Sequence, residues 1–125
     1  MPIYVTFYHL DHTMVGRTEG DVTLADLMGY LDDVEKAKAV GYAKIFDCTV
    51  GQANLMPVER ETFGKRLAAY HARYGKQAGA FAVVAGPDVT TRLADLYALV
   101  PPADTRPVKI LGDIHAARKW LAEQD

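Results

Sequence analysis

The chain has 125 residues, of which 50% are hydrophobic and 24% charged, and its formal net charge is −2. This length allows one core, so we expect residues 1–125 to form one complete domain. The charge balance offers no basic face for nucleic acid, and the single cysteine, Cys48, excludes an internal disulfide. The chain start lacks the basic and apolar segments of a signal peptide, and the longest weakly polar run, residues 78–87, is too short to span a membrane. We therefore expect a cytoplasmic protein.

The first third of the chain predicts a hairpin followed by a helix. Residues 3–8 alternate apolar and polar side chains with the period of a strand, and residues 13–19 predict an antiparallel partner for it. Thr23 is a good helix N-cap, with Asp26 three residues later. Apolar residues then recur at helical spacing as far as Gly41, which predicts that the helix ends there at a C-terminal glycine.

The rest of the chain continues this alternation. Residues 43–47 predict a third strand, and Pro57 suits the first position of a second helix. Residues 78–85 are almost continuously apolar, which is typical of a strand buried on both faces of a parallel sheet. Residues 89–100 predict a third helix, and residues 108–111 predict the last strand.

A fourth helix, which Asp113 caps, completes the order β-β-α-β-α-β-α-β-α. Strands that alternate with helices predict a single α/β domain with a five-stranded, mostly parallel sheet. If successive strands are neighbours, right-handed crossovers place all crossover helices on one face. The other face would then be largely open, although residues 80–85 are apolar in both directions. Because an exposed apolar face usually marks an interface, we expect a homodimer.

Three stretches at the junctions of this layout resemble the SpoIIAA-like proteins and their STAS-domain relatives. Residues 20–23 (Gly-Asp-Val-Thr) match the entry into the first helix, and residues 44–47 (Lys-Ile-Phe-Asp) match the strand that ends in Asp. Residues 82–85 (Ala-Val-Val-Ala), followed by a polar break and an apolar helix, match the third crossover. The resemblance spans nearly the whole chain. It implies a SpoIIAA-like fold used for protein interaction or, in SEC14-like cousins, for apolar ligands.

The phosphorylation switch of this family does not carry over. SpoIIAA is an anti-anti-sigma factor that binds a kinase partner and is phosphorylated on a serine in an Asp-Ser-Ser-Gly motif at the start of the second helix. Counted from Asp47, that motif would fall near Leu55, Met56 and Pro57, none of which accepts a phosphate, and the chain contains no serine. The resemblance therefore implies an interaction module without this switch.

The expected interaction surface lies on the loop after the third strand and the opening turns of the second helix, with residues 86–88 beside them. These segments leave the carboxyl ends of predicted neighbouring strands, where open α/β sheets often place functional groups. The helix N-termini there present free N–H groups that suit an acidic side chain or a small anion. The residues predicted for this surface are Asp47, Cys48, Thr49, Asn54, Met56, Glu59, Arg60 and Asp88.

Several of these residues also have a purely structural interpretation. Asp47 can accept hydrogen bonds from backbone N–H groups of the loop, and Cys48 can be a buried, inert thiol. Thr49 is a conceivable phospho-acceptor but is also ordinary in a loop. The charges of the second helix, including Glu61 and Lys65 at i,i+4 spacing, can form a solvated face instead of a docking edge.

Catalytic and metal-binding motifs are missing from the sequence. His9, Asp11 and His12 provide too few ligands in one hairpin for a metal site, and no glycine-rich nucleotide loop or serine nucleophile is present. We therefore expect no enzyme activity, metal or cofactor. The leading interpretation is a non-catalytic protein-interaction or regulatory module of STAS type in the bacterial cytoplasm, with an unknown protein partner. The alternative is a SEC14-like binder of a lipid or other small apolar ligand, to which seven Tyr and four Phe could contribute.

Overall fold

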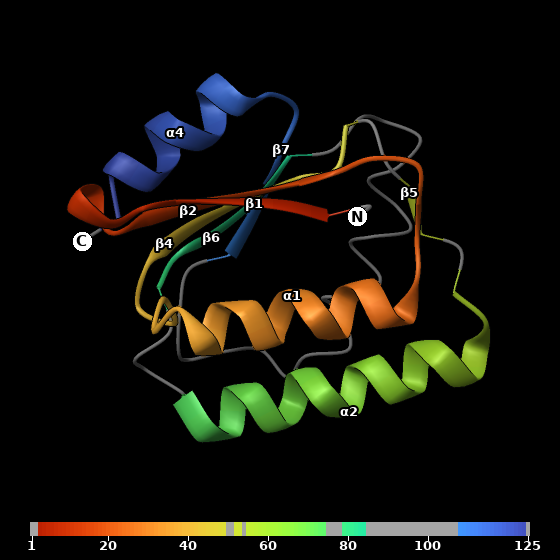
Figure 1. The fold of residues 1–125 in the computed structure, drawn as a ribbon. Coiled ribbons are helices and arrows are strands. Elements are labelled where there is room, and N and C mark those ends of the chain that lie inside the picture. Colours follow the sequence, from red (N-terminus) through yellow and green to blue (C-terminus); the bar gives the residue numbers. More distant parts are fainter. Residues whose placement is uncertain (1–2, 50–51, 54, 75–78, 85–107, 125) are drawn as a thin grey trace.

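The computed structural model describes residues 3–49, 52–53, 55–74, 79–84 and 108–124. These residues form one α/β domain whose central five-stranded sheet has helices on both faces (Figure 1). The predicted fold class is therefore confirmed. The predicted third helix, with Asp88 just before it, lies outside the described residues.

The main strands lie side by side in their order along the chain: β1 (Ile3–Tyr8), β2 (Thr13–Thr18), β4 (Ala43–Asp47), β6 (Phe81–Val84) and β7 (Val108–Leu111). β1 is antiparallel to β2, and the other neighbouring pairs are parallel. β6 is consequently next to the central strand, as its continuous apolar sequence predicted.

The two faces of the sheet have separate cores. α1 (Leu24–Lys36) and α2 (Pro57–Tyr74) cover one face, whereas α4 (Ile114–Ala122) covers β4, β6 and β7 on the other (Figure 1). The α1 and α2 side holds the larger core, with Phe46 and Phe81 among its members. The two crossover helices that the structure describes thus share a face, as the handedness rule predicted.

α4 covers the face of β6 that was expected to be open and on which the expected homodimer was based. Ala82 and Val84 point to that face and pack with Ala117 of α4. α4 follows the last strand and is therefore not a crossover helix, so the handedness rule does not constrain its side. The second apolar face of β6 is explained by α4 without a partner chain.

α1 begins as predicted and ends earlier than predicted. Thr23 and Asp26 form a complete capping box, in which the N–H of Thr23 donates to Asp26 Oδ2 at 2.8 Å. The helix ends at Lys36 and not at Gly41. The N–H of Lys38 donates to the Glu35 carbonyl at 3.1 Å, and the N–H of Ala39 donates to the Val34 carbonyl at 3.0 Å. These are the two bonds of a Schellman motif, in which Lys38, with φ of 57°, takes the left-handed position that glycine usually fills.

Three short elements, β3 (Asp21–Val22), β5 (Gln52–Ala53) and η1 (His9–Asp11), were not predicted from the sequence. β3 and β5 form a separate two-stranded parallel sheet, because two residues are too few to show a strand period. The link of the first hairpin is a single turn of 3-10 helix, η1, followed by His12 in a left-handed conformation. These differences change the connections and leave the order of the main strands intact.

Candidate functional site

Asp47 shapes the turn that follows β4. Its Oδ1 accepts hydrogen bonds from the backbone N–H of Thr49 at 3.0 Å and from the Thr49 hydroxyl at 2.7 Å. The Thr18 hydroxyl donates to the Asp47 carbonyl at 3.2 Å and ties the same turn to β2. The contacts of Asp47 and Thr49 therefore agree with their structural interpretation as partners in a loop.

Cys48 points into the core, although it was predicted on the interaction surface. Its side chain is fully buried, and its N–H donates to the Val84 carbonyl at 2.7 Å. Burial, with a smaller effect from the charge of Asp47, raises the pKa of the thiol far above its usual value. Because the thiolate is the reactive form, Cys48 is an inert core residue and does not reach the surface.

The start of α2 (Pro57–Tyr74) and the residue before it expose apolar side chains to solvent. Met56 and Val58 are 64% and 65% exposed, and Pro57 between them is also exposed. Glu59 Oε1 accepts a hydrogen bond from the N–H of Met56 at 3.0 Å, which is half of a capping box. We call Met56, Pro57, Val58, Glu59 and Arg60 the α2 entry surface.

The structure divides the predicted surface between the two faces of the sheet. Asp47 lines a hollow beside Ile114 and Arg118 of α4. The α2 entry surface belongs to the helical layer on the other face, and α2 begins below β5 at the right of Figure 1. Asn54 and Asp88 lie outside the described residues. The predicted residues thus form no single cluster within the part of the chain that the structure describes.

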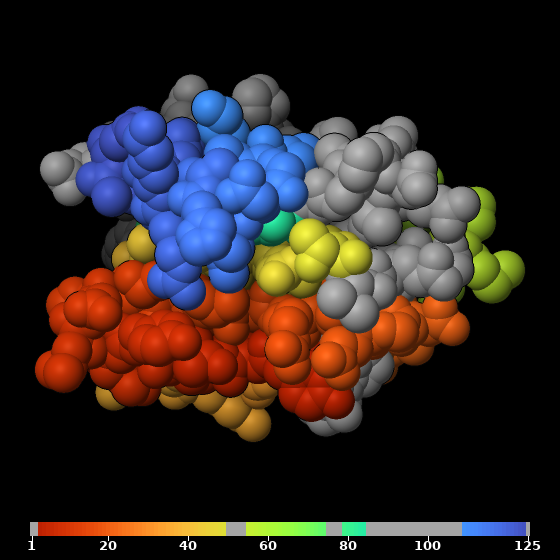
Figure 2. Space-filling model, turned by 90° about the horizontal axis from the view of Figure 1, so that it is seen from above, coloured from red at the N-terminus to blue at the C-terminus, as the bar shows by residue number. Residues whose placement is uncertain are grey.

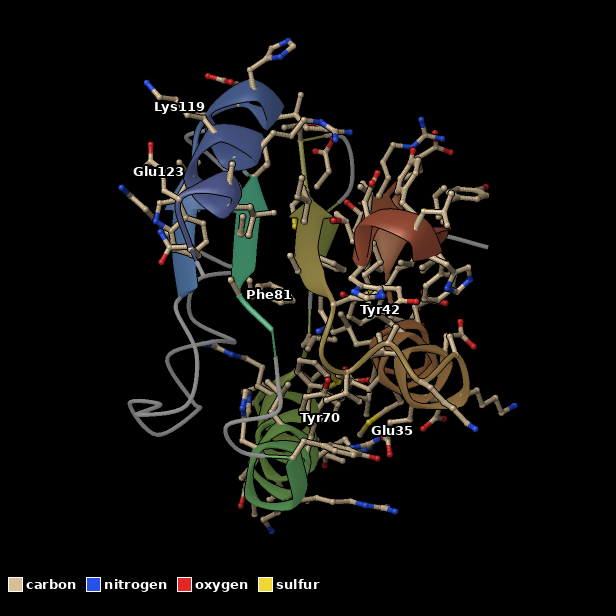
Figure 3. The ribbon with its side chains drawn as sticks, turned by 90° about the vertical axis from the view of Figure 1, so that its left-hand side faces the viewer. Glu35, Tyr42, Tyr70, Phe81, Lys119 and Glu123 are labelled. Carbon is tan, nitrogen blue, oxygen red and sulfur yellow. The ribbon has the colours of Figure 1, made fainter. Side chains whose placement is uncertain are left out.

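The remaining charges of α2 have two different environments. Lys65 Nζ lies 3.6 Å from Glu61 Oε1, and both side chains are largely exposed, as in an ordinary surface pair. Arg66 instead forms an ion pair with Glu35 of α1, and the hydroxyl of Tyr74 donates to Glu35 Oε2 at 2.7 Å. Figure 3 shows Glu35 in the space between α1 and α2. The hydrogen bonds from Tyr74 and Arg66 hold the pKa of Glu35 below its usual range, although partial burial acts in the opposite direction.

Lys44 is a buried charge that the sequence did not single out. Its Nζ donates to the carbonyl oxygens of Val40 at 2.6 Å and Tyr42 at 2.8 Å. The space beside it, which Leu67 and Phe81 also line, measures about 10 Å³. This volume holds one water molecule at most, so Lys44 has structural contacts and no room for a substrate beside it.

The histidines of the first hairpin make aromatic contacts. His9 stacks on Phe7 with ring centroids 5.6 Å apart, and its Nδ1 lies 2.6 Å from the hydroxyl of Tyr42. His12 also lies against the Tyr42 ring. Within the described ranges, no three His, Cys, Asp or Glu side chains come together to hold a metal ion. No helix in those ranges is long and apolar enough to cross a membrane.

Comparison with known proteins identifies the fold. No family model and no curated protein matches the chain. A solved structure with 19% sequence identity matches with a TM-score of 0.58, covering 95% of this chain and 91% of the other. It is an uncharacterised protein of the DUF3478 family from Shewanella loihica PV-4, described as having a SpoIIAA-like fold. The sheet order, the helices on both faces and this similarity together show that the chain has the SpoIIAA-like fold.

Proposed function

We propose that this chain is a non-catalytic, STAS-type interaction module of the bacterial cytoplasm that binds a partner protein through the α2 entry surface. The observation that carries this proposal is the exposure of Met56, just before α2, and of Val58 in its first turn. Methionine is enriched at protein interfaces, and burying a side chain of this size contributes about 1.5–3 kcal/mol. The charged Glu59 and Arg60 adjoin the apolar pair and would form a polar rim.

The chemistry of the chain supports binding more than catalysis. The sequence has no serine, and its only cysteine is a buried thiol with a raised pKa. Lys44 is enclosed by carbonyl oxygens. The family resemblance also implies partner binding near the start of this helix. Regulation by a phosphoserine at that position would require a residue that this chain lacks.

A pair of charge substitutions tests the surface without weakening the helix. Met56→Asp and Val58→Asp place carboxylates at the N-cap and in the first turn of α2, where both are favourable. Leu10→Asp is the matched control, since Leu10 is fully exposed on the hairpin at the other end of the sheet. Each protein is immobilised, incubated with bacterial cytoplasmic extract and compared by quantitative mass spectrometry.

The expected result is a protein that the wild type and Leu10→Asp retain and the double variant loses. Calorimetry with that purified protein should then show binding at least about tenfold weaker for the double variant, a difference of about 1.4 kcal/mol. Equal retention of every captured protein by all three chains would contradict the proposed surface.

The alternative function, binding of a lipid or other small apolar ligand, has less support. The space between α1, α2 and the sheet that Lys44 adjoins has room for no such ligand. The two hollows beside β1, of about 230 and 370 Å³, have polar or charged side chains in their walls. Native mass spectrometry of the purified protein separates the two functions, because a co-purifying apolar molecule would favour the alternative.

Self-association stays a prediction. Since α4 covers the face of β6 on which the dimer was first based, a dimer would have to use another surface. Light scattering at roughly tens of micromolar, a range in which ordinary dimers persist, measures it directly.

A further inference from the structure

β1 is an edge strand without the usual protection against pairing. Its described backbone pairs only with β2, and the register from Ile3 to Tyr8 continues without a bulge. The strand contains no charged residue and no proline, which are common devices for blocking an edge. Figure 3 shows the β1–β2 hairpin at the edge of the sheet opposite β7. This edge can therefore hydrogen-bond another strand.

One hollow flanks this edge on the α1 face of the sheet. It has a volume of about 230 Å³, an apolar floor that includes Ile3 and Val5, and the carboxylates of Asp26 and Asp33 in its wall. Asp26 is occupied in the helix cap, whereas Asp33 is exposed and has no ion pair among the described residues. Gly29 leaves the wall open, since a Cβ placed there would meet no atom within 4 Å. This hollow suits apolar and basic side chains.

A second hollow flanks the same edge on the α4 face. α4 leaves the hairpin side of this face uncovered (Figure 2), and the resulting hollow measures about 370 Å³. Tyr4 and Tyr8 of β1, each 45% exposed, lie along it, together with Arg17 of β2 and Arg118 of α4. The guanidinium of Arg17 lies 5.7 Å from the centre of the Tyr4 ring.

The described lining of the second hollow includes two arginines and one aspartate. Glu19 lies 3.5 Å from Arg17, and both side chains are about half exposed. Asp47 is the one carboxylate in the described lining, set against the two arginines, and its Oδ1 accepts two hydrogen bonds from Thr49. Arg118 has no carboxylate partner within the described ranges. An acidic group of a ligand therefore finds an available cation here, in a chain whose net charge is negative.

The two hollows lie on opposite faces of the sheet, where the alternating side chains of a strand added to β1 would point. Successive side chains of an added strand point to opposite faces, so one set enters the α1 hollow and the other set enters the α4 hollow. We propose that the free edge of β1 binds an extended segment of a partner protein by strand addition, with apolar and basic side chains toward Asp33 and acidic side chains toward Arg17 and Arg118. This surface is separate from the α2 entry surface, so either can fail without the other.

The charges favour a different chain over a second copy. Antiparallel pairing of β1 with β1 of another copy, about a two-fold axis perpendicular to the sheet, keeps the same face of both sheets upward. The hollows that contain Asp33 would then lie on the same side of the joined sheet, and the arginine hollows would lie together on the other side. Like charges across such a junction oppose pairing, whereas a partner with alternating basic and acidic side chains meets both hollows with opposite charge.

Two synthetic peptides test this arrangement. The first is acetyl-Thr-Lys-Glu-Val-Glu-Val-Glu-Lys-Thr-amide, in which lysine and valine share one face and glutamate lies on the other. The second exchanges every lysine and glutamate. The net charge of the chain is −2, so its overall field favours the second peptide, whereas the two hollows favour the first. Heteronuclear NMR titrations give the affinities and locate the perturbed amides.

The expected result is binding of the first peptide at least about tenfold tighter than the second, with amide shifts concentrated on β1. Gly29→Leu fills the α1 hollow and replaces a helix-interior glycine by a better helix former, so the variant should fold and bind about tenfold more weakly. Ala72→Leu, on an exposed position of α2, is the matched control and should bind as the wild type does. Arg118→Glu should reduce or reverse the preference between the peptides.

Several outcomes would overturn the proposal. They are equal affinity for the two peptides, no binding of the first peptide at about 1 mM, the weak limit of useful affinity, and shifts confined to residues away from β1. A dimer in light scattering would also overturn it if, in the free protein, the β1 amides that point away from β2 were protected from exchange, since a second copy would then occupy the edge.

Discussion

Gly79 occupies a position that no residue with a side chain can take without movement of the backbone. A Cβ at this position would lie 2.2 Å from the carbonyl oxygen of Tyr42 and 2.7 Å from that of Gly41. Both obstacles are main-chain atoms, so no side-chain rotation relieves them. The N–H of Gly79 also donates to the Val40 carbonyl at 3.0 Å, which anchors the chain just before β6.

The cost of Gly79→Ala follows from these contacts. The Cβ must move from 2.2 Å to at least 3.0 Å from the Tyr42 oxygen, and such overpacking costs about 1–3 kcal/mol. The same displacement strains the bond to Val40, and an unsatisfied backbone donor costs about 1–3 kcal/mol more. We expect a total loss of about 2–6 kcal/mol, a large part of the roughly 5–15 kcal/mol that stabilises a typical domain.

Urea denaturation measures this loss, with far-UV circular dichroism and the fluorescence of the single tryptophan, Trp120, as probes. Gly112→Ala is the matched control, since a Cβ there meets no atom within 4 Å, and it should change stability by less than about 0.5 kcal/mol. A loss below about 1 kcal/mol for Gly79→Ala, with the control unchanged, would refute the close approach of the two loops.

The remaining predictions concern the helices. Leu31→Ala and Leu67→Ala each remove a buried core side chain and should cost about 2–5 kcal/mol in the same titration; losses below about 1 kcal/mol would contradict the assigned core faces. Lys38→Gly relieves a left-handed φ of 57° and should stabilise the protein by about 0.5–1 kcal/mol, whereas a loss of stability would contradict the Schellman motif. The hydrogen bonds from Tyr74 and Arg66 lower the pKa of Glu35. These contacts therefore stabilise the fold fully at pH values above the ordinary pKa of glutamate. The stabilisation is lost as the pH falls through the lowered pKa that Glu35 has in the folded state. The difference in unfolding free energy between the wild type and Glu35→Gln should accordingly be larger at neutral pH than at about pH 3, well below the ordinary glutamate pKa, and a difference independent of pH would count against the assigned contacts.

Much of the local structure around the candidate surface follows from the sequence. Asp47 is a short acceptor at the end of a strand, and residues of this type commonly bond the N–H groups of the following turn. Cys48 lies two residues after Phe46, so the strand period places it on the same buried face. Pro57 marked the start of α2, and in the structure the carboxylate of Glu59 caps that start by accepting a hydrogen bond from the N–H of Met56.

The turn at Lys38, just after the end of α1, does not follow the usual preference for glycine. A glycine usually takes the left-handed position after a helix, and Gly41 was the nearest candidate. In the structure Val34, Ala39 and Val40 are buried, and the turn at Lys38 brings Ala39 and Val40 into the core. Core packing therefore outweighed the backbone preference of lysine at this position.

The sequence by itself determined the α/β class, the succession of the main strands along the chain and the buried faces of α1, α2 and α4, because these depend on hydrophobic periods that a few neighbouring residues establish. Only the tertiary structure decided that α4 covers β6, that Asp47 and the α2 entry surface lie on opposite faces, and that a hollow with two aspartates and a hollow with two arginines flank β1. Each of these features joins segments that are far apart in the chain. Their relative positions depend on which packing of whole elements buries the most apolar surface, and no local period records that choice.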